Sequence, residues 1–199
     1  AAIGAPALDR LLRDAVRVSF NMLSVDSDTS TSDTCAILAN GLAGAVDEQA
    51  FADQLTAGCI RMTELLARDG EGATRLLRAT VRGAANDADA IAVARSLINS
   101  PLIKTMVHGA DPNVGRILMA IGKTDAAMEP ARTMASVNGC PVVRNGARME
   151  FDDATVRAAL ATAEVDLVVE LGVGTASATA YGCDLSKGYI DENAAYYSS

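Results

Sequence analysis

The turn Asp69-Gly70-Glu71-Gly72 offers a carboxylate that could bind a positively charged ligand. Glu71 lies between two glycines, so little side-chain bulk surrounds it, and a carboxylate on such a sharp turn can pair with an ammonium group. Charged residues at the tips of turns are nevertheless usually just solvated. The spacing alone therefore favours a solvated turn, with ammonium binding as the alternative.

A polar loop within the segment Lys104 to Lys123 is a second candidate, in this case for an anion or a carbonyl group. Its residues are typical of turns: Gly109, Asp111, Pro112 and Asn113. Apolar residues then recur at helical spacing: Val114, Ile117, Leu118 and Ile121. The first turn of this predicted helix would present free N–H groups. A plain turn is still the more common role of such a loop.

Residues 26–34 form a cluster of hydroxyl and acidic side chains, with the sequence DSDTSTSDT. Such residues cap helices and form Asx and Ser/Thr turns. Apolar runs flank the cluster on both sides, which predicts a loop folded against the body of the protein instead of a solvated linker. For the hydroxyls, a structural role is favoured over direct contact with a substrate.

Histidine and cysteine usage argues against metal and triad chemistry. The sequence has one histidine, His108, and four widely spaced cysteines without a C-x-x-C pair: Cys35, Cys59, Cys140 and Cys183. We therefore expect no metal site and a structural or peripheral role for His108. The apolar neighbours of Cys35 and Cys59 predict that these two thiols are buried and unreactive.

Length and composition fit a single α/β unit over residues 1–199. Half of the residues are hydrophobic, and the formal net charge is −8. Because nucleic acid binding needs clustered Lys and Arg, we expect no nucleic-acid partner. The sequence shows neither an apolar run of membrane-spanning length nor the pattern of a signal peptide, so we expect a cytoplasmic protein that does not bind membranes.

Hydrophobic periodicity and turn residues predict the elements that would position these side chains. Helices are expected at 5–20, 47–70, 86–98, from 114, and at 152–161. Strands are expected at 20–26, over 73–84, at 165–173 and from 175. Two further short strands are expected within 136–149, with Asn138-Gly139 and Asn145-Gly146 as hairpin signals. The helix from Asp47 carries an apolar stripe that we expect to be buried, formed by Phe51, Leu55, Cys59, Met62, Leu65 and Leu66.

Four separated blocks of the sequence resemble the ornithine acetyltransferase (glutamate N-acetyltransferase) family of arginine biosynthesis. Residues 104–117 are similar to the signature KT-x-x-x-G-x-D-P-N-W-G-R-I, with Val114 in place of the tryptophan. Residues 20–41 resemble FN-x-I-x-VD-x-DTST-x-DT-x-x-L-x-A-x-G. Residues 69–75 resemble D-G-E-G-A-T-K, with Arg75 in place of the lysine. From Tyr181 on, the chain is similar to YGCDL-x-x-GYV-x-x-NA-x-Y-x-[ST].

The resemblance implies an α/β fold of the self-cleaving ornithine acetyltransferase type (DmpA/OAT-type), with mixed sheets layered with helices. It also implies a substrate-binding role for Glu71, Asn193 and Ser198. Glu71 would pair with the α-ammonium or the side-chain amine of the substrate. No cofactor is implied, although acetyl-CoA is an alternative acetyl donor in the family.

Family members are made as a precursor that cleaves itself before a threonine, which then begins the second chain. This threonine accepts the acetyl group, and its own α-amine serves as the base. The resemblance thus implies ping-pong transfer from N-acetylornithine, which releases ornithine, to glutamate. The expected partner is the alpha chain of the same precursor, which supplies the oxyanion hole, in an α2β2 or higher assembly.

The first residue departs from this pattern because Ala1 is not threonine. The opening residues resemble those that follow the family's T-D-A segment, so we expect the nucleophile upstream of Ala1 and assign no catalytic residue within the sequence. Two alternatives stay open: an amidohydrolase or aminopeptidase of the same self-cleaving fold, and a scaffold subunit without catalysis. The sequence also leaves open whether the pathway is arginine synthesis or specialised metabolism.

Overall fold

Alternating apolar residues build the central strands of a mixed sheet in the computed structural model, which describes residues 1–194. In β6 (Glu164–Glu170) every second side chain is buried, and the middle of β2 (Leu76–Ala84) shows the same alternation. These two strands pair in parallel. On its other side, β2 pairs antiparallel with β7 (Ala176–Cys183). The alternation therefore gives the sheet one apolar face and one polar face.

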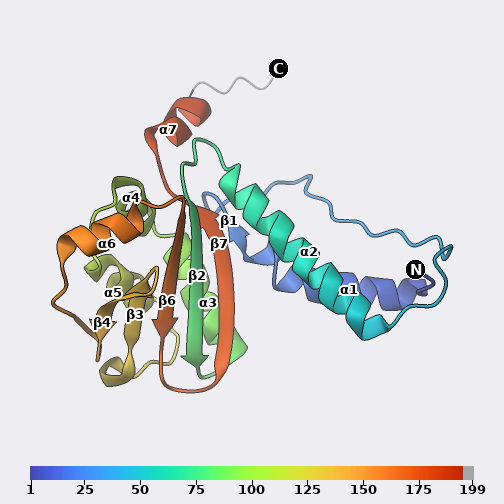
Figure 1. The fold of residues 1–199 in the computed structure, drawn as a ribbon, viewed down its shortest axis with the longest axis horizontal. Coiled ribbons are helices and arrows are strands. Elements are labelled where there is room, and N and C mark those ends of the chain that lie inside the picture. Colours follow the sequence, from blue (N-terminus) through green and yellow to red (C-terminus); the bar gives the residue numbers. More distant parts are fainter. Residues whose placement is uncertain (195–199) are drawn as a thin grey trace.

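Within residues 1–194 the sheet has seven strands in the order β1-β7-β2-β6-β3-β4-β5. The remaining strands are β1 (Leu23–Ser24), β3 (Met134–Val137), β4 (Cys140–Arg144) and β5 (Ala147–Arg148). Parallel and antiparallel pairs occur in this one sheet, and helices pack on it (Figure 1). The predicted α/β class with mixed sheets layered with helices is therefore confirmed.

The helices of the described part begin and end as follows: α1 (Ala5–Arg17), α2 (Glu48–Arg68), α3 (Asp87–Ile98), α4 (Pro101–Gly109), α5 (Gly115–Gly122), α6 (Asp153–Leu160) and α7 (Lys187–Ala194). Short 3₁₀ helices cover Phe20–Met22 and Pro130–Arg132. The sequence analysis did not predict α4, because Pro101 suggested a boundary. In the structure the proline occupies the first turn of α4, where its missing N–H costs nothing.

The apolar face of the sheet is covered by α3, which packs against both β2 and β7. Buried side chains there include Val81, Val93, Leu97 and Ala180. α4 and α5 continue this layer of helices behind the sheet (Figure 1). This arrangement brings the end of β7 close to α4, which is the geometry that the candidate site depends on.

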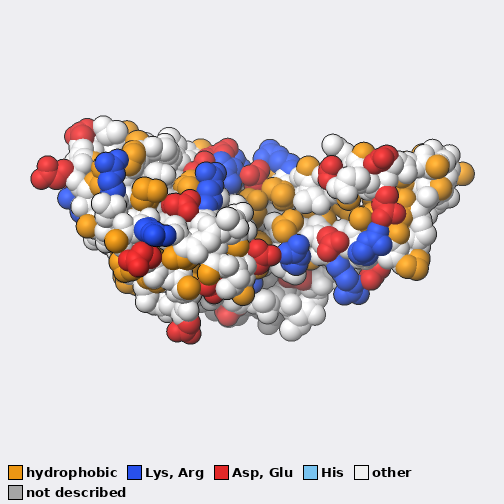
Figure 2. Space-filling model, turned by 90° about the horizontal axis from the view of Figure 1, so that it is seen from below, with side chains coloured by type: hydrophobic (Ala, Val, Ile, Leu, Met, Phe, Trp, Pro, Cys, Tyr) orange, Lys and Arg blue, Asp and Glu red, His pale blue; other side chains and the backbone are white. Residues whose placement is uncertain are grey.

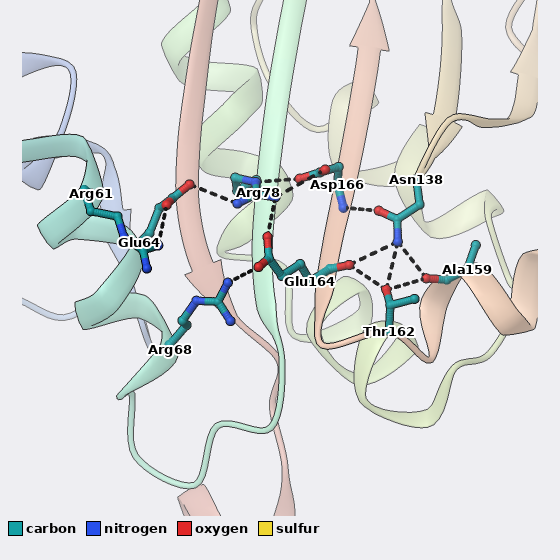
Figure 3. A network of polar contacts seen from close by, with 9 residues as sticks. All are labelled: Arg61, Glu64, Arg68, Arg78, Asn138, Ala159, Thr162, Glu164 and Asp166. Atoms are coloured by element: carbon teal, nitrogen blue, oxygen red, sulfur yellow. Dashed lines mark hydrogen bonds and ion pairs between the residues drawn. The ribbon is translucent and has the colours of Figure 1, made fainter. Parts of the chain in front are cut away.

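The polar face of the sheet carries a network of ion pairs centred on Arg78 (Figure 3). The Arg78 guanidinium contacts Asp166 at 2.6 Å and Glu164 at 2.7 Å on β6, and Glu64 at 2.9 Å on α2. Bonds to these carboxylates raise the pKa of Arg78, with burial opposing the change. The network joins α2 to the two central strands.

Helices α1 and α2 pack on each other and form an arm that extends sideways from the sheet (Figure 1). The predicted apolar stripe of α2 is largely wrong: only Cys59 of its residues is buried in the structure. Met62, Leu65 and Leu66 are about half exposed, at 49%, 48% and 50%. The buried face is instead formed by Cys59, Thr63 and Ala67, because α2 has apolar residues around more of its circumference than its neighbours in this chain cover.

The strand β1 and the segment that follows it differ from three expectations. Residues 26–36 are exposed throughout, so the predicted folding of this loop against the body is wrong, and Cys35 is exposed, not buried. Its hydroxyls bond within the segment, as in the contact of Thr34 Oγ1 with the Ser32 carbonyl. The predicted strand at 20–26 is reduced to a 3₁₀ turn and two strand residues, because only Leu23 and Ser24 pair with β7.

Local turn chemistry gives the hairpins their predicted positions. Asn138 and Gly139 both have positive φ, at 44° and 79°, and join β3 to β4. Asn145 and Gly146, at 52° and 70°, join β4 to β5. Asn-Gly pairs accept these angles most easily, so the hairpin prediction is confirmed. Among the described helices, none is long and apolar enough to cross a membrane.

Candidate functional site

The turn that carries Glu71 is packed directly against α7. Gly72 has a φ of +62°, and a Cβ at this position would lie 2.3 Å from the Tyr189 N atom, so only glycine fits there. The Gly72 N–H donates to Glu192 Oε1 at 3.1 Å, and the Ser186 hydroxyl donates to the Gly72 carbonyl. Segments more than 100 residues apart in sequence are thus joined at one glycine.

Two of the predicted site residues lie on these joined segments. Glu71 is exposed at the tip of the turn. Asn193 is exposed in the last turn of α7 and donates from Nδ2 to the Tyr189 carbonyl at 3.0 Å. Ser198, the third predicted residue, lies outside the described residues. The structure therefore brings the segments of Glu71 and Asn193 together at the same end of the sheet.

The end of β7 packs against the turn at Gly70. A Cβ on Gly70 would lie 2.9 Å from Cys183 Sγ, so the turn sits directly on this buried thiol. Burial raises the pKa of Cys183. Tyr189 of α7 donates its hydroxyl to Asp26 at 3.0 Å, which ties the start of the exposed hydroxyl-rich segment to the same place. This bond to Asp26 raises the pKa of Tyr189.

Asp184, directly after β7, lies below the turn with its side chain fully buried. Its Oδ1 accepts from the N–H groups of Thr74 and Arg75, at 2.7 and 2.9 Å. Its Oδ2 accepts from the Thr74 hydroxyl at 2.6 Å and lies 2.7 Å from His108 Nδ1. Burial by itself would raise the pKa of Asp184, but these bonds outweigh it, so the pKa lies below its ordinary value and the group is ionised near neutral pH.

Helix α4 supports the same segment from below. Lys104 is buried, and its Nζ donates to the Cys183 carbonyl and lies 3.8 Å from Cys183 Sγ. Burial lowers the pKa of Lys104, while the neighbouring Cys183 and Asp184 oppose the change. At the other end of α4, the Arg75 guanidinium donates to the carbonyls of Val107 and His108 in the last turn of the helix, where carbonyls lack regular helical partners. The turn, α4 and the end of β7 thus form one connected polar unit.

The sequence analysis missed Asp184, Thr74 and Lys104 as members of this unit. Two weak signals pointed to them: an aspartate directly after an apolar strand, and a lysine within the apolar run PLIKTMV. A charged residue in such surroundings is buried only with partners. His108, expected to be structural or peripheral, is the partner of Asp184.

The mixed sheet with helices on its apolar face, and the turn held against the last helix, define a protein with the ornithine acetyltransferase type of α/β fold. The model of the ArgJ family matches residues 1–198, and the chain belongs to this family. In a solved structure, the arginine biosynthesis bifunctional protein ArgJ of Bacillus halodurans, 34% of the residues are identical and the TM-score is 0.95; the match covers 98% of this chain and 96% of that one.

Curated relatives agree with this assignment. The chain is 45% identical over 192 residues to the arginine biosynthesis bifunctional protein ArgJ of Rhodococcoides fascians, covering 95% of this chain and 48% of that protein. It is 42% identical over 194 residues to glutamate N-acetyltransferase Oat2 of Streptomyces clavuligerus, covering 94% and 49%. The chain therefore spans about half the length of the curated relatives it matches.

Proposed function

We propose that the protein containing this chain is a glutamate N-acetyltransferase of the ornithine acetyltransferase type, which moves an acetyl group from N-acetylornithine to glutamate. Membership of the ArgJ family supports this proposal, as does the similarity to glutamate N-acetyltransferase Oat2 of Streptomyces clavuligerus. The observation that carries the role of this chain is the contact at Gly72, which joins the turn of Glu71 to the helix of Asn193.

In the proposed reaction, a threonine hydroxyl attacks the acetyl carbonyl of N-acetylornithine. The C–N bond breaks, the amine of ornithine leaves with a proton, and an acetyl ester forms on the threonine. The α-amine of glutamate then attacks the ester, which yields N-acetylglutamate and restores the hydroxyl. We propose that the threonine is the first residue of its processed chain, so that its own α-amine carries the proton. It belongs to a part of the protein that this sequence does not contain.

Glu71 would hold an ammonium group of the amino-acid substrate, and Asn193 and Ser198 would hold its other polar groups. Glu71 presents an exposed carboxyl group on a turn where glycines flank it, which suits a cationic partner. In the first half-reaction Glu71 would hold the side-chain ammonium of N-acetylornithine, whose α-nitrogen carries the acetyl group. In the second, the α-ammonium of glutamate would pair with the carboxylate on arrival and lose a proton before its nitrogen attacks the ester. No cofactor is needed, and acetyl-CoA would be a second acetyl donor.

The remaining half of the protein would be the partner of this chain, as an alpha chain cut from the same precursor and assembled into α2β2 or larger. The half-exposed residues Met62, Leu65 and Leu66 on α2 support a further covering chain, since soluble proteins rarely leave such side chains grouped in water.

Figure 2 shows Lys and Arg interspersed with Asp and Glu on one face of the molecule, without a basic patch there for nucleic acid.

Acetyl exchange between N-acetylornithine and glutamate in the complete enzyme tests the proposal. We expect Glu71→Ala to raise KM for both amino acids about tenfold to a hundredfold, since a lost bond to a charged group is worth about 1.5–3 kcal/mol. Glu150→Ala, at another exposed glutamate, is the control and leaves KM unchanged. Wild-type KM values in Glu71→Ala would remove Glu71 from the site.

The same assay separates the alternatives. An amidohydrolase would release acetate from N-acetylornithine at the same rate with and without glutamate. A scaffold subunit would show neither hydrolysis nor transfer. Either result in the complete wild-type protein contradicts the proposed function.

A further inference from the structure

Asp184 links the two segments that carry the proposed substrate-binding residues. Its carboxylate bonds to Thr74 and Arg75, which lie three and four residues after Glu71. The chain that continues from Asp184 leads within a few residues into α7, which carries Asn193. Any change in the position of this carboxylate therefore changes the position of Glu71 relative to Asn193.

The carboxylate has little freedom to move. A fully buried and ionised carboxylate is stable only while its oxygens accept hydrogen bonds, and both Asp184 oxygens do so from two donors each. The contact of Gly72 with Glu192, in contrast, is exposed to solvent. Asp184 is thus a fully buried group that holds the residues directly after the turn.

His108 fixes the carboxylate from α4. The His108 side chain is 39% exposed, so filling the core is not its main role, and its Nδ1 lies 2.7 Å from Asp184 Oδ2. Lys104, one helical turn earlier, holds the Cys183 carbonyl. Successive turns of the same helix therefore hold two consecutive residues of the segment, and the Arg75 guanidinium closes the arrangement at the end of α4.

We propose that Asp184 and His108 are positioning residues for the amino-acid substrate: without touching it, they set Glu71 at the correct place relative to Asn193. This inference rests on the proposed function for its kinetic consequences. Its geometric part, the placement of the turn by the His108–Asp184 contact, is independent of the reaction.

Kinetics of the complete enzyme test the first part through His108→Leu and Thr74→Val, each of which removes one bond to Asp184 Oδ2. We expect KM for N-acetylornithine and for glutamate to rise about tenfold, with kcat changed by less than about threefold. His108→Asn should restore KM, because the Asn Nδ2 lies as many bonds from Cβ as the His Nδ1. Unchanged KM values in folded His108→Leu and Thr74→Val would overturn the inference, even if both unfold at lower temperature.

Thr155→Val is the matched control for Thr74→Val. Thr155 donates its hydroxyl to Asp152 at 2.6 Å, the same kind of bond, at the start of α6. We expect both kinetic constants of this variant to equal those of the wild type. A rise in KM as large as that in Thr74→Val would show a general effect of lost hydroxyl bonds and would contradict a specific role for Asp184.

Amide hydrogen exchange tests the geometric part without any activity. We expect the N–H groups of Gly72, Thr74 and Arg75 to exchange faster in His108→Leu, and at the wild-type rate in His108→Asn and Thr155→Val. If the wild-type enzyme transfers no acetyl group, the proposed function fails while this measurement still decides the geometry. Unchanged exchange in His108→Leu would overturn the inference on its own, and Thr74→Val provides the same test if His108→Leu does not fold.

Discussion

At the scale of single residues, the absence of a side chain at Gly72 allows the turn that carries Glu71 to pack against α7. Two separate effects make this glycine necessary: its backbone has a φ of +62°, and a Cβ would collide with the backbone of Gly188 and Tyr189. The chain contains glycines that isolate each effect. Gly139 has a φ of +79° with open space around it, and Gly58 lies in α2 with open space and no positive φ.

Alanine substitutions at these three glycines should therefore give graded results. Gly58→Ala is expected to stabilise the protein by about 0.5–1 kcal/mol, because alanine favours the helix. Gly139→Ala should cost about 1 kcal/mol through its backbone angle alone. Gly72→Ala should cost more, on the order of 2–3 kcal/mol, and should also raise KM, because α7 must move.

Unfolding in urea measures the three free energies, and acetyl exchange measures KM. Equal losses for Gly72→Ala and Gly139→Ala, with KM unchanged in both, would show that α7 does not depend on close contact with the turn.

At the scale of elements, the sequence predicted what depends on neighbouring residues and missed what depends on distant ones. The Asn-Gly hairpins and the helix starts at Asp47, Asn86 and Asp152 depend on residues a few positions apart, and each lies within one residue of its predicted position. The exposure of Leu65 and Leu66 depends on which chain covers α2, so periodicity could not show it.

In the candidate site, too, some residues could be predicted from the sequence and others could not. The resemblance pointed to Glu71 and Asn193, but the carboxylate of Asp184 meets Thr74 and His108 only because β7 lies next to β2 and ends beside α4. No spacing along the chain contains this information, since these partners are separated by 110 and 76 residues.

Arg78 joins the α2 arm to the sheet and provides the test at this scale. Its side chain is 23% exposed and contacts three carboxylates, so Arg78→Leu would remove the cation that they share. Arg61 would still pair with Glu64 and Arg68 with Glu164, but Asp166 would lose its ion pair with Arg78. We expect a loss of about 2–3 kcal/mol in unfolding free energy. Arg13→Leu, which breaks an exposed pair with Asp9 on α1, should cost clearly less, because solvent screens that pair. Equal losses in urea unfolding would contradict an anchoring role for Arg78.

At the scale of the whole molecule, the segments that carry the proposed substrate-binding residues lie together. The turn of Glu71, the buried carboxylate of Asp184 and α7 meet at one end of the sheet, while the apolar residues of α2 remain half exposed beside it. Both features fit a protein in which a second chain completes the active site. The central claim is therefore that acetyl transfer passes through an acetylated enzyme and that glutamate removes the acetyl group.

The intact masses of the complete enzyme's chains, recorded after incubation with N-acetylornithine alone and again after addition of glutamate, test this claim most directly. We predict that the chain containing residues 1–199 gains the mass of one acetyl group on its amino-terminal threonine and loses it when glutamate is added, with N-acetylglutamate formed in equal amount. Formation of N-acetylglutamate without any acetylated chain, or loss of the acetyl group to water at the same rate without glutamate, would contradict the account.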